Sequence, residues 1–341
     1  MGRTDRKRIT IIGSGAIGAS LGLALRASPN AARFEVVGHD REPLTARRAL
    51  KAGAFDRVAL TLGGALERAA MVILAVPLAA LRPLLADVGE ILADADGVLI
   101  TDTATLKAPV LRWAEEHLPA GLHFVGGDPF LAPQEGRWHL ARGLEAARAD
   151  LFHGARYAIV PPARGHEGAV RTMADLAALV GAEPLLMEPL EHDMARLLAE
   201  MLPAFAAAAL VQSTARRPGW REARRAAGYG YATATAAVEL EAPESLRMMA
   251  MLRREALLPR LDAFIEAAQA LRRRLAEGDA DSLEAAFAAA QQARAAWASA
   301  AHAHRWEFEP TMPPLLDLFR RTAQAVVGRW GAADEEPSGE R

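Results

Sequence analysis

The first 160 residues alternate short apolar runs with longer stretches in which apolar residues recur every three or four positions. The apolar runs have the length and composition of strands buried on both faces, and they cover residues 8–12, 35–38, 71–75, 98–101, 123–125 and 157–160. Apolar strands that alternate with helices are typical of a parallel sheet covered by helices on both sides. The pattern therefore predicts an α/β fold, a doubly wound parallel sheet of the Rossmann type.

The second half of the chain is predicted to be helical. After Pro161 and Pro162 only residues 183–187 still have the pattern of a strand, and the predicted helices cover residues 194–214, 245–277 and 282–304. We therefore expect an α/β domain over residues 1–163 and an all-helical C-terminal domain over residues 164–330. Residues 331–341 are expected to form a disordered acidic tail.

Composition and charge are those of a globular protein without a general attraction to polyanions. Hydrophobic residues make up 51% and charged residues 24% of the 341 positions, which excludes a low-complexity chain. The net charge is −2, so we expect neither nucleic acid nor a membrane surface as a partner. The longest apolar run, residues 201–211, is shorter than the roughly 18 residues that cross a bilayer and contains Pro203. These features predict a cytoplasmic protein, and the absence of cysteine excludes disulfides.

A glycine-rich turn follows the first predicted strand and precedes a predicted helix. Its residues match the G-x-G-x-x-G pattern of dinucleotide-binding turns and are Gly13, Ser14, Gly15, Ala16, Ile17 and Gly18. The first glycine permits the tight turn, the second lets the backbone approach a pyrophosphate, and the third lets the helix pack closely on the strand. The helix N-terminus then supplies an anion-binding site.

Asp40 ends the second predicted strand, roughly 20 residues after the last glycine, where an acid hydrogen-bonds the adenosine ribose. An acid at this place repels a 2′-phosphate, so the sequence predicts NAD rather than NADP as the cofactor. Arg41 beside it would weaken that preference. The alternative is that Asp40 only caps the helix that follows.

Three further strand ends carry residues that would meet at the carboxyl edge of the sheet, where open α/β sheets bind ligands. Val76 and Pro77 follow the third strand, and Pro77 could equally serve only to end it. Asp102 and Lys107 bracket the next strand end, with an exposed turn as the alternative. Asp128 ends the strand after that, and a turn or N-cap residue is the alternative.

Metal chemistry is not expected. The nine histidines do not include a set with zinc-like spacing, since His192 beside Asp193 and the pair His302 and His304 lack a third ligand, and no cysteine is present. The sequence also lacks the nucleophile elbow of α/β hydrolases and the phosphate loop of NTPases.

The order of these motifs resembles the prephenate/arogenate dehydrogenase family of tyrosine biosynthesis, from about Arg8 to about Arg274. The resemblance is carried by the glycine turn, by the strand ends at Asp40, Val76-Pro77, Thr105-Leu106-Lys107 and Gly126-Gly127-Asp128-Pro129, by the run from Gly143 to Phe152, and by His192-Asp193 leading to Leu202-Pro203. It implies an NAD-dependent oxidoreductase that performs an oxidative decarboxylation of a small-molecule substrate. It also implies a helical C-terminal domain that forms a homodimer and closes the substrate site.

The chain departs from the family pattern at the residues that handle the substrate. Asp128 stands where the family has a histidine that hydrogen-bonds the substrate hydroxyl, and Thr105 replaces a serine. The second histidine-bearing motif corresponds to residues 200–204, so its two histidines become Met201 and Ala204. The arginine that binds a substrate carboxylate aligns with Ala234. The resemblance therefore implies that Asp128 and Thr105 are the catalytic residues at the substrate hydroxyl.

These departures leave three hypotheses open. The protein is a dehydrogenase of the prephenate/arogenate type, a dehydrogenase of a different and less acidic substrate, or a catalytically silent NAD-binding sensor or partner subunit. A carboxylate is a weak base at neutral pH, because its usual pKa is about 4. Arg137, Arg142 or Arg253 would have to replace the missing arginine.

Overall fold

The computed structural model describes residues 6–131, 143–215 and 217–303. The chain divides after Arg294, and every element discussed below that builds the site lies before that point. Eight strands form one sheet in the order β3-β2-β1-β4-β5-β6-β7-β8. Their bounds are β1 Lys7–Ile12, β2 Phe34–His39, β3 Arg57–Val58, β4 Ala69–Leu74, β5 Leu99–Asp102, β6 His123–Phe130, β7 Arg156–Val160 and β8 Glu183–Leu186.

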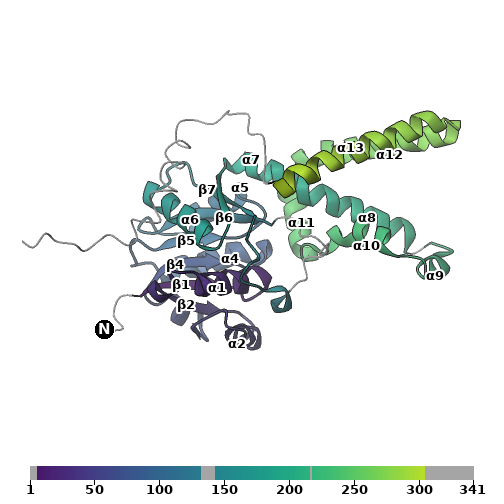
Figure 1. Ribbon diagram of the computed structural model, residues 1–341. Coiled ribbons are helices and arrows are strands. Elements are labelled where there is room, and N and C mark those ends of the chain that lie inside the picture. The colour runs from purple at the N-terminus through teal and green to yellow at the C-terminus, as the bar shows by residue number, and fades with distance from the viewer. Residues whose placement is uncertain (1–5, 132–142, 216, 304–341) are drawn as a thin grey trace, which may run out of the picture. The chain divides into compact units, whose positions relative to one another are not determined.

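The order of strands reverses at β1, which pairs in parallel with both β2 and β4 (Figure 1). Strands β1 to β6 are all parallel, so their carboxyl ends meet at one edge of the sheet, and the crevice beside β1 and β4 is the usual ligand site of such folds. Strand β7 pairs with β6 in the antiparallel sense, and β8 is parallel to β7. The predicted doubly wound Rossmann-type fold is confirmed, with a sheet that is mostly rather than wholly parallel.

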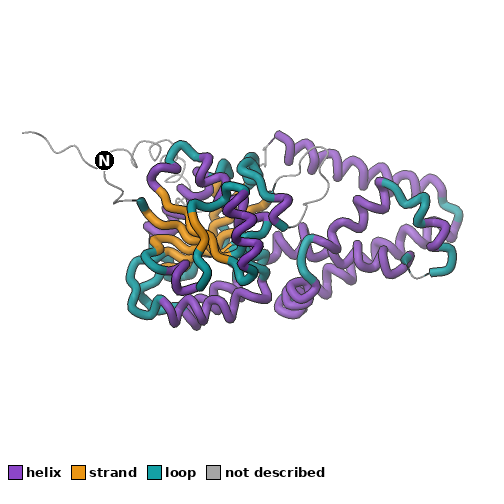
Figure 2. Tube along the Cα trace, turned by 90° about the horizontal axis from the view of Figure 1, so that it is seen from below, coloured by secondary structure: helices purple, strands orange, loops and turns teal. Residues whose placement is uncertain are grey.

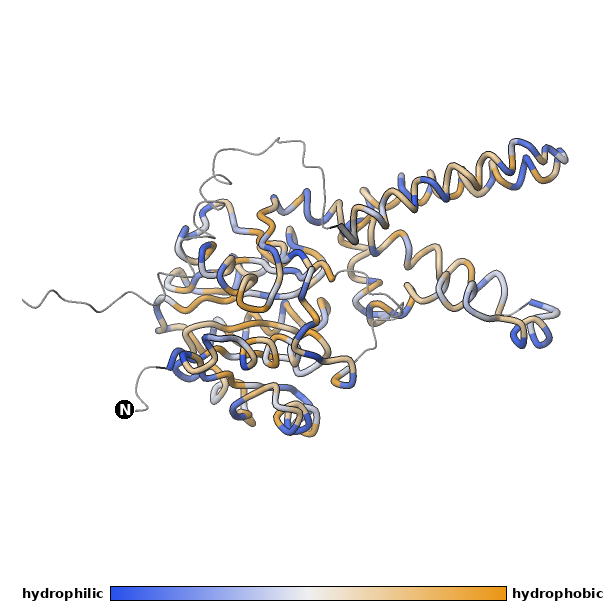
Figure 3. Tube along the Cα trace, viewed as in Figure 1, coloured by the Kyte–Doolittle hydropathy of each residue, from blue (hydrophilic) through white to orange (hydrophobic). Residues whose placement is uncertain are grey.

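Helices lie on both sides of the sheet, as Figure 2 shows. They are α1 Ala16–Ala27, α2 Pro43–Lys51, α3 Leu62–Leu66, α4 Leu78–Ile91, α5 Ala108–His117 and α6 Glu167–Leu179, with short 3₁₀ turns at Ala31–Arg33 and Leu144–Ala146. Hydrophobic residues predominate in the centre of the sheet (Figure 3), where Ile11, Ile73 and Ile100 are fully buried. Burial on both faces explains why these strands are continuous apolar runs in the sequence.

The chain after the sheet is helical, as predicted. Its elements are α7 Pro189–Arg196, a π-helical turn η3 Leu197–Met201, α8 Leu202–Thr214, α9 Trp220–Ala223, α10 Tyr229–Thr235, a 3₁₀ turn η4 Ala236–Glu239, α11 Pro243–Leu252, α12 Arg254–Glu277 and α13 Ala280–Ala303. The π turn ends two residues before Pro203, which lacks an N–H and crowds the preceding turn, so the regular hydrogen-bond pattern is interrupted there. The predicted helix over residues 245–277 is interrupted at Arg253.

The domain boundary after residue 163 stays a prediction. Strand β8 pairs with β7 and α6 packs on β6 and β7, so the layers of the sheet extend to Leu186. The predicted acidic tail, residues 331–341, lies outside the described residues.

The helices of the second half expose much of their apolar surface. Only Ala204 and Ala207 of α8 are buried, and only Leu257 of α12. Among the described residues, one helical stretch, Pro189–Thr214, is long and apolar enough to cross a membrane when judged by length and composition alone, and 22% of its most apolar window is buried.

Candidate active site

The glycine turn has the geometry that a dinucleotide requires. Gly13 has φ of +101°, and a Cβ there would collide with the carbonyl oxygen of Ala75. A Cβ at Gly18 would collide with the carbonyl oxygen of Gly13, so α1 can approach β1 only with glycine at this position. Gly15 is the N-cap of α1, and a Cβ there would meet no atom within 4 Å. The first and third glycines are therefore needed for packing, whereas the second leaves open space beside the helix N-terminus.

Asp40 is bonded both to the glycine turn and to the residue that begins the following helix. Its Oδ2 accepts a hydrogen bond from the backbone N–H of Ser14 at 2.7 Å, and its Oδ1 accepts one from the N–H of Glu42 at 2.9 Å. Glu42 is the N-cap of α2, so Asp40 is not that cap residue. These two bonds hold the carboxylate beside the glycine turn, and its contact with a ribose stays a prediction.

These residues fit a dinucleotide. The hydroxyl of Ser14 is buried and has no hydrogen-bond partner among the described residues, which leaves a polar group beside the anion-binding helix end. Ala16 and Ile17 form the first turn of α1, Val76 packs beside Gly13, and Pro77 begins α4 at the same edge of the sheet. This set would hold the cofactor, and the role of each residue stays a prediction.

The end of β5 carries a buried ion pair. Asp102 and Lys107 are both fully buried, and the Lys107 ammonium donates to Asp102 Oδ2. The same carboxylate accepts hydrogen bonds from the N–H of Ala104 at 2.9 Å and of Gly127 at 3.3 Å. Burial raises the pKa of Asp102, and the charge of Lys107 opposes that effect. The alternative of an exposed turn at this place is wrong, and the pair joins the loop after β5 to β6.

Asp128 is 2% exposed and lies between two cationic or proton-donating side chains of α7. Its Oδ2 lies 3.0 Å from Nε2 of His192 and forms an ion pair with Nε of Arg196, also at 3.0 Å. The Phe130 ring stacks on His192 with the ring centres 5.5 Å apart, and the Arg196 guanidinium lies 5.2 Å from the centre of the same ring. Asp128 is therefore a fixed, compensated carboxylate and not a turn residue or an N-cap.

Asp193 connects His192 to the loop that contains Thr105. Its Oδ1 lies 3.2 Å from Nδ1 of His192 and accepts the backbone N–H of Lys107 at 2.6 Å. Its Oδ2 accepts the N–H of Ala108 at 3.3 Å, so a residue from α7 caps the N-terminus of α5. This cap fixes the loop between β5 and α5 against α7.

Thr105 is 5% exposed, and its hydroxyl donates to Glu241 Oε1 at 3.0 Å. Glu200 lies on the π turn and accepts a hydrogen bond at 3.1 Å from Arg196. Burial raises the pKa of Glu200, Arg196 opposes the effect, and the charges of Asp128 and Glu241 add to it. Two glutamates thus lie close to the two residues that were predicted to be catalytic.

Of the three arginines expected to replace the missing one, only Arg253 lies in the described part of the chain. Arg253 is directed at Asp193, with 3.9 Å between Nε and Oδ2. Ala234 is exposed on α10, and Arg137 and Arg142 lie outside the described residues. The cation that the structure places against Asp128 is Arg196, which sequence reasoning missed.

His192, Glu200 and Glu241 were also missed as site residues. In the sequence, His192 stands out only as a possible metal ligand, without a third partner, and as part of the family pattern. Its place in the His192-Asp193 pair, which forms part of the family resemblance, is the signal that could have identified it. Arg196 gave no signal, since arginine is common throughout this chain.

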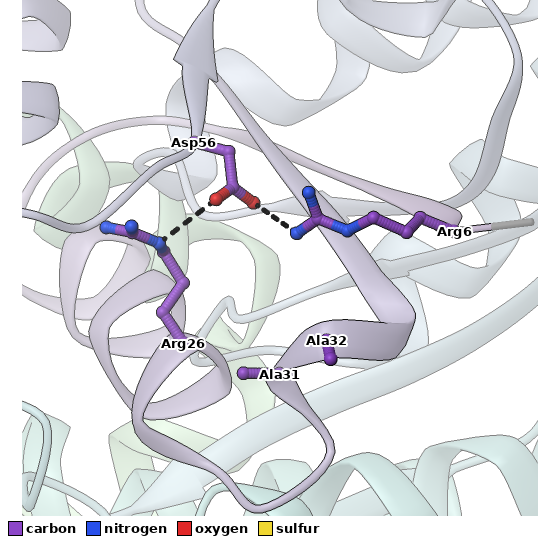
Figure 4. Close-up of a pocket in the computed structure, with 5 residues that line it drawn as sticks. All are labelled: Arg6, Arg26, Ala31, Ala32 and Asp56. Atoms are coloured by element: carbon purple, nitrogen blue, oxygen red, sulfur yellow. Dashed lines mark hydrogen bonds and ion pairs between the residues drawn. The ribbon is translucent and has the colours of Figure 1, made fainter. Parts of the chain in front are cut away.

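The hollow drawn in Figure 4 is not this site. It is lined by Arg6, Arg26, Ala31, Ala32 and Asp56, and lies by the amino ends of β1 and β2. Asp56 lies between the two arginines, 3.2 Å from Arg6 and 3.3 Å from Arg26, and accepts the N–H of Val36 at 2.8 Å. These contacts fasten loops at the opposite edge of the sheet from the glycine turn.

Among the described residues, no group of three or more His, Asp or Glu side chains is arranged to hold a metal ion.

Comparison with known proteins identifies two adjoining family matches. Residues 21–186 match the nucleotide-binding domain of prephenate dehydrogenase, and residues 188–289 match its dimerization domain. The chain is 28% identical over 287 residues to the prephenate dehydrogenase of Bacillus subtilis, which covers 84% of this chain and 75% of that protein. It is 30% identical over 189 residues to the enzyme of Lactococcus lactis, which covers 55% of this chain and 48% of that protein.

Solved structures share the fold. A crystal structure of prephenate dehydrogenase from A. aeolicus, in complex with hydroxyphenyl propionate and NAD+, superimposes with a TM-score of 0.73 at 20% identity over 86% of this chain and 99% of that one. The Synechocystis arogenate dehydrogenase gives 0.65 at 24% identity over 85% of this chain and 99% of that one.

Proposed function

The chain belongs to the prephenate dehydrogenase family, and on that premise we propose that it oxidises and decarboxylates a cyclohexadienol of the prephenate or arogenate type. It is an NAD-dependent oxidoreductase of this family, as its sequence predicted. The substrate is the part that the proposal adds. NAD supplies a hydride acceptor, and side chains of the site bind the substrate and accept its hydroxyl proton.

One observation carries the proposal. A buried polar network joins Asp128, through His192 and Asp193, to the backbone N–H of Lys107, in the same loop as Thr105. Buried charges are costly unless each is paired, and here each is paired. A silent NAD-binding subunit has no use for such a network at the carboxyl edge of its sheet, so its presence favours an enzyme.

The chemistry assigned to the residues follows from their surroundings. Asp128 is the proton acceptor for the substrate hydroxyl, because a carboxylate oxygen can accept a proton and Arg196 fixes this carboxylate in place. Thr105 orients the same hydroxyl. Its O–H donates to Glu241 in this structure, so its lone pairs remain available to accept from a substrate.

A dehydrogenase of a less acidic substrate is the second candidate. It is favoured by two acids that would repel a dianion: Glu200, which feels the charge of Asp128, and Glu241, which accepts the hydroxyl of Thr105. Arg196, which faces Asp128 and Glu200, offsets part of that charge.

The enzyme is proposed to be a cytoplasmic homodimer. The α12 helix has apolar residues with alternating spacings of four and three, which is the seam of a coiled coil, although it buries only one of them within the chain. The seam residues are Leu257, Leu261, Phe264, Ala268, Leu271 and Leu275. A second copy of the helical region would cover this surface, which agrees with the dimerization domain matched there. Light scattering should give twice the chain mass, and Phe264→Glu should lower it, whereas Gln269→Glu, outside the seam, should not. A monomeric parent protein would contradict this assembly.

The activity is tested by incubating the protein with NAD and either prephenate or arogenate, while NADH is followed by its absorbance and the product is identified by chromatography. The expected product is 4-hydroxyphenylpyruvate or tyrosine. Asp128→Asn should keep NAD affinity and lower turnover by about 10² to 10⁴, the usual contribution of a positioned base. If NAD binds but neither compound is oxidised, the substrate assignment is wrong and the second candidate takes its place.

A further inference from the structure

The contact between Asp128 and His192 requires a proton. The oxygen and nitrogen lie 3.0 Å apart, and Asp193 accepts a backbone N–H on the oxygen that also faces the other imidazole nitrogen. Because a carboxylate cannot donate, Nδ1 of His192 carries a hydrogen directed at Asp193. A second proton must then lie between Nε2 and Asp128, since two lone pairs do not approach to hydrogen-bond distance.

We propose that His192 holds the substrate's hydroxyl proton during the reaction, and that Asp128 passes the proton between substrate and imidazole. The 3.0 Å between Nε2 of His192 and Oδ2 of Asp128 is a distance at which the two atoms can share this proton. Loss of the shared proton prepares the pair to accept the one from the substrate. The proposal rests on the proposed function, because it concerns a step of that reaction. His192 touches Asp128 rather than the substrate, so it is a positioning and proton-holding residue.

The step balances in atoms and charge. As the hydride leaves the hydroxyl-bearing ring carbon, the O–H bond breaks, a C=O bond forms and the proton moves through Asp128 to Nε2 of His192. When the ring carbon opposite loses carbon dioxide, the bonding pair enters the ring and the oxygen becomes a phenolate. The phenolate takes the proton back. The proton acceptor therefore has to keep the proton only until decarboxylation, and no net proton is released.

Burial suits this role. His192 and Asp193 are fully buried and Asp128 is 2% exposed, so a proton held there does not exchange readily with water. The Phe130 ring covers one face of the imidazole. Asp128 alone is a poor acceptor at neutral pH, because carboxylic acids as a class titrate about two units below imidazole. An imidazole behind it corrects that mismatch without itself reaching the substrate.

Charged and titratable side chains from several elements surround the pair. On α7, Arg196 lies against Asp128 and pairs with its Oδ2 at 3.0 Å. Arg253, between α11 and α12, places its Nε 3.9 Å from Oδ2 of Asp193. Asp102 and Tyr157, on β5 and β7, lie close enough for the charges of Asp102 and Asp128 to raise the pKa of the Tyr157 hydroxyl, after the larger effect of its burial.

Two more groups act through these neighbours. Glu200 bonds to the far side of Arg196, and Lys107 contributes its backbone N–H to Asp193 while its ammonium is paired with Asp102. The hydroxyl of Tyr157 is buried without a hydrogen-bond partner in the described chain and stays protonated, so it is not a competing base.

The pH dependence of kcat/KM tests the proposal. In the parent protein the acid limb should lie where the Asp128–His192 pair loses its shared proton. In His192→Gln the acceptor is Asp128 alone beside Arg196, so the limb should move down by about one pH unit or more, and turnover at neutral pH should fall about 10- to 100-fold. The matched control is His123→Gln on β6, which stacks on His166 away from the site and should leave the limb in place.

A measurement on the unaltered protein keeps the test independent of whether the variant folds. Nitrogen NMR of His192 should show Nδ1 protonated throughout, and Nε2 losing its proton over the pH range in which activity rises. An Nε2 that stays protonated across the whole active range would overturn the proposal, as would an acid limb unchanged in a folded His192→Gln. Absence of turnover in the parent protein would instead contradict the proposed function, and the two failures are thus distinct.

Discussion

The ion pair between Asp128 and Arg196 should contribute far more to stability than a surface pair of the same length. Two unit charges 3.0 Å apart attract by about 5.5 kcal/mol at an effective dielectric constant of about 20. Desolvation offsets much of this. Arg196→Met leaves Asp128 buried with His192 as its remaining partner. The unpaired carboxylate can take up a proton instead of staying charged, and because protonating an ordinary carboxyl at pH 7 costs about 4 kcal/mol, the loss of stability cannot exceed about that amount. We therefore expect Arg196→Met to lower the free energy of unfolding by about 2 to 4 kcal/mol.

The assay is a double-mutant cycle by urea unfolding at pH 7, with Arg196→Met, Asp128→Asn and both together. The expected coupling free energy is about 2 to 3 kcal/mol. Arg82 and Glu116 provide the control, because they lie 3.1 Å apart but are 58% and 50% exposed, and such a pair couples by about 0.2 to 1 kcal/mol. If the Asp128–Arg196 coupling is no larger than that of the control pair, the account of a compensated buried carboxylate is refuted.

Three further predictions concern the cofactor turn and the sheet. Asp40→Ala should weaken the binding of NAD by about 10- to 100-fold, because hydrogen bonds to a charged group are lost, and should weaken the binding of NADP much less. Equal losses of affinity for the two cofactors in calorimetry would contradict the ribose contact. Gly15→Ala should abolish NAD binding but change the free energy of unfolding by about 0.5 kcal/mol or less. Gly18→Ala should impair both NAD binding and stability, and a Gly18→Ala variant as stable as the parent would contradict the close packing of α1. Burial alone would raise the pKa of Glu35, but Arg8 and Arg57 lower it below the usual value of 4.5. Glu35 therefore stabilises the fold at pH values above 4.5, and this stabilisation is lost as the pH falls through the lowered pKa. Glu35→Gln should therefore cost about 1 kcal/mol or less at pH 7, and a difference from the parent that fails to shrink in acid unfolding would contradict this.

Local patterns in the sequence were sufficient for most of the fold. Strands buried on both faces are recognisable as continuous apolar runs, and each of the predicted ones is present. Strand β3 was missed because it has only two residues, Arg57 and Val58, neither of them fully buried. The antiparallel pairing of β7 was also missed, because strand direction depends on the path of the connection and not on the residues of the strand.

The cofactor turn could be predicted because its glycines and Asp40 lie at a fixed spacing. The contacts at the proposed substrate site could not be predicted in this way. The contact between Asp128 and His192 joins residues 64 positions apart, and that between Thr105 and Glu241 joins residues 136 apart. Only tertiary packing makes such contacts, so local sequence gave Asp128 as a candidate but not the partners that determine its chemistry.

The central claim, oxidative decarboxylation by this chain, is tested most directly by the stoichiometry of one reaction. The protein is incubated with NAD and the substrate that supports turnover, labelled in the ring carboxylate, and NADH and released carbon dioxide are measured in the same sample. The account predicts equal amounts of the two, formed together, and loss of both in Asp128→Asn. NADH formed without carbon dioxide would make the protein a simple alcohol dehydrogenase and would contradict the account.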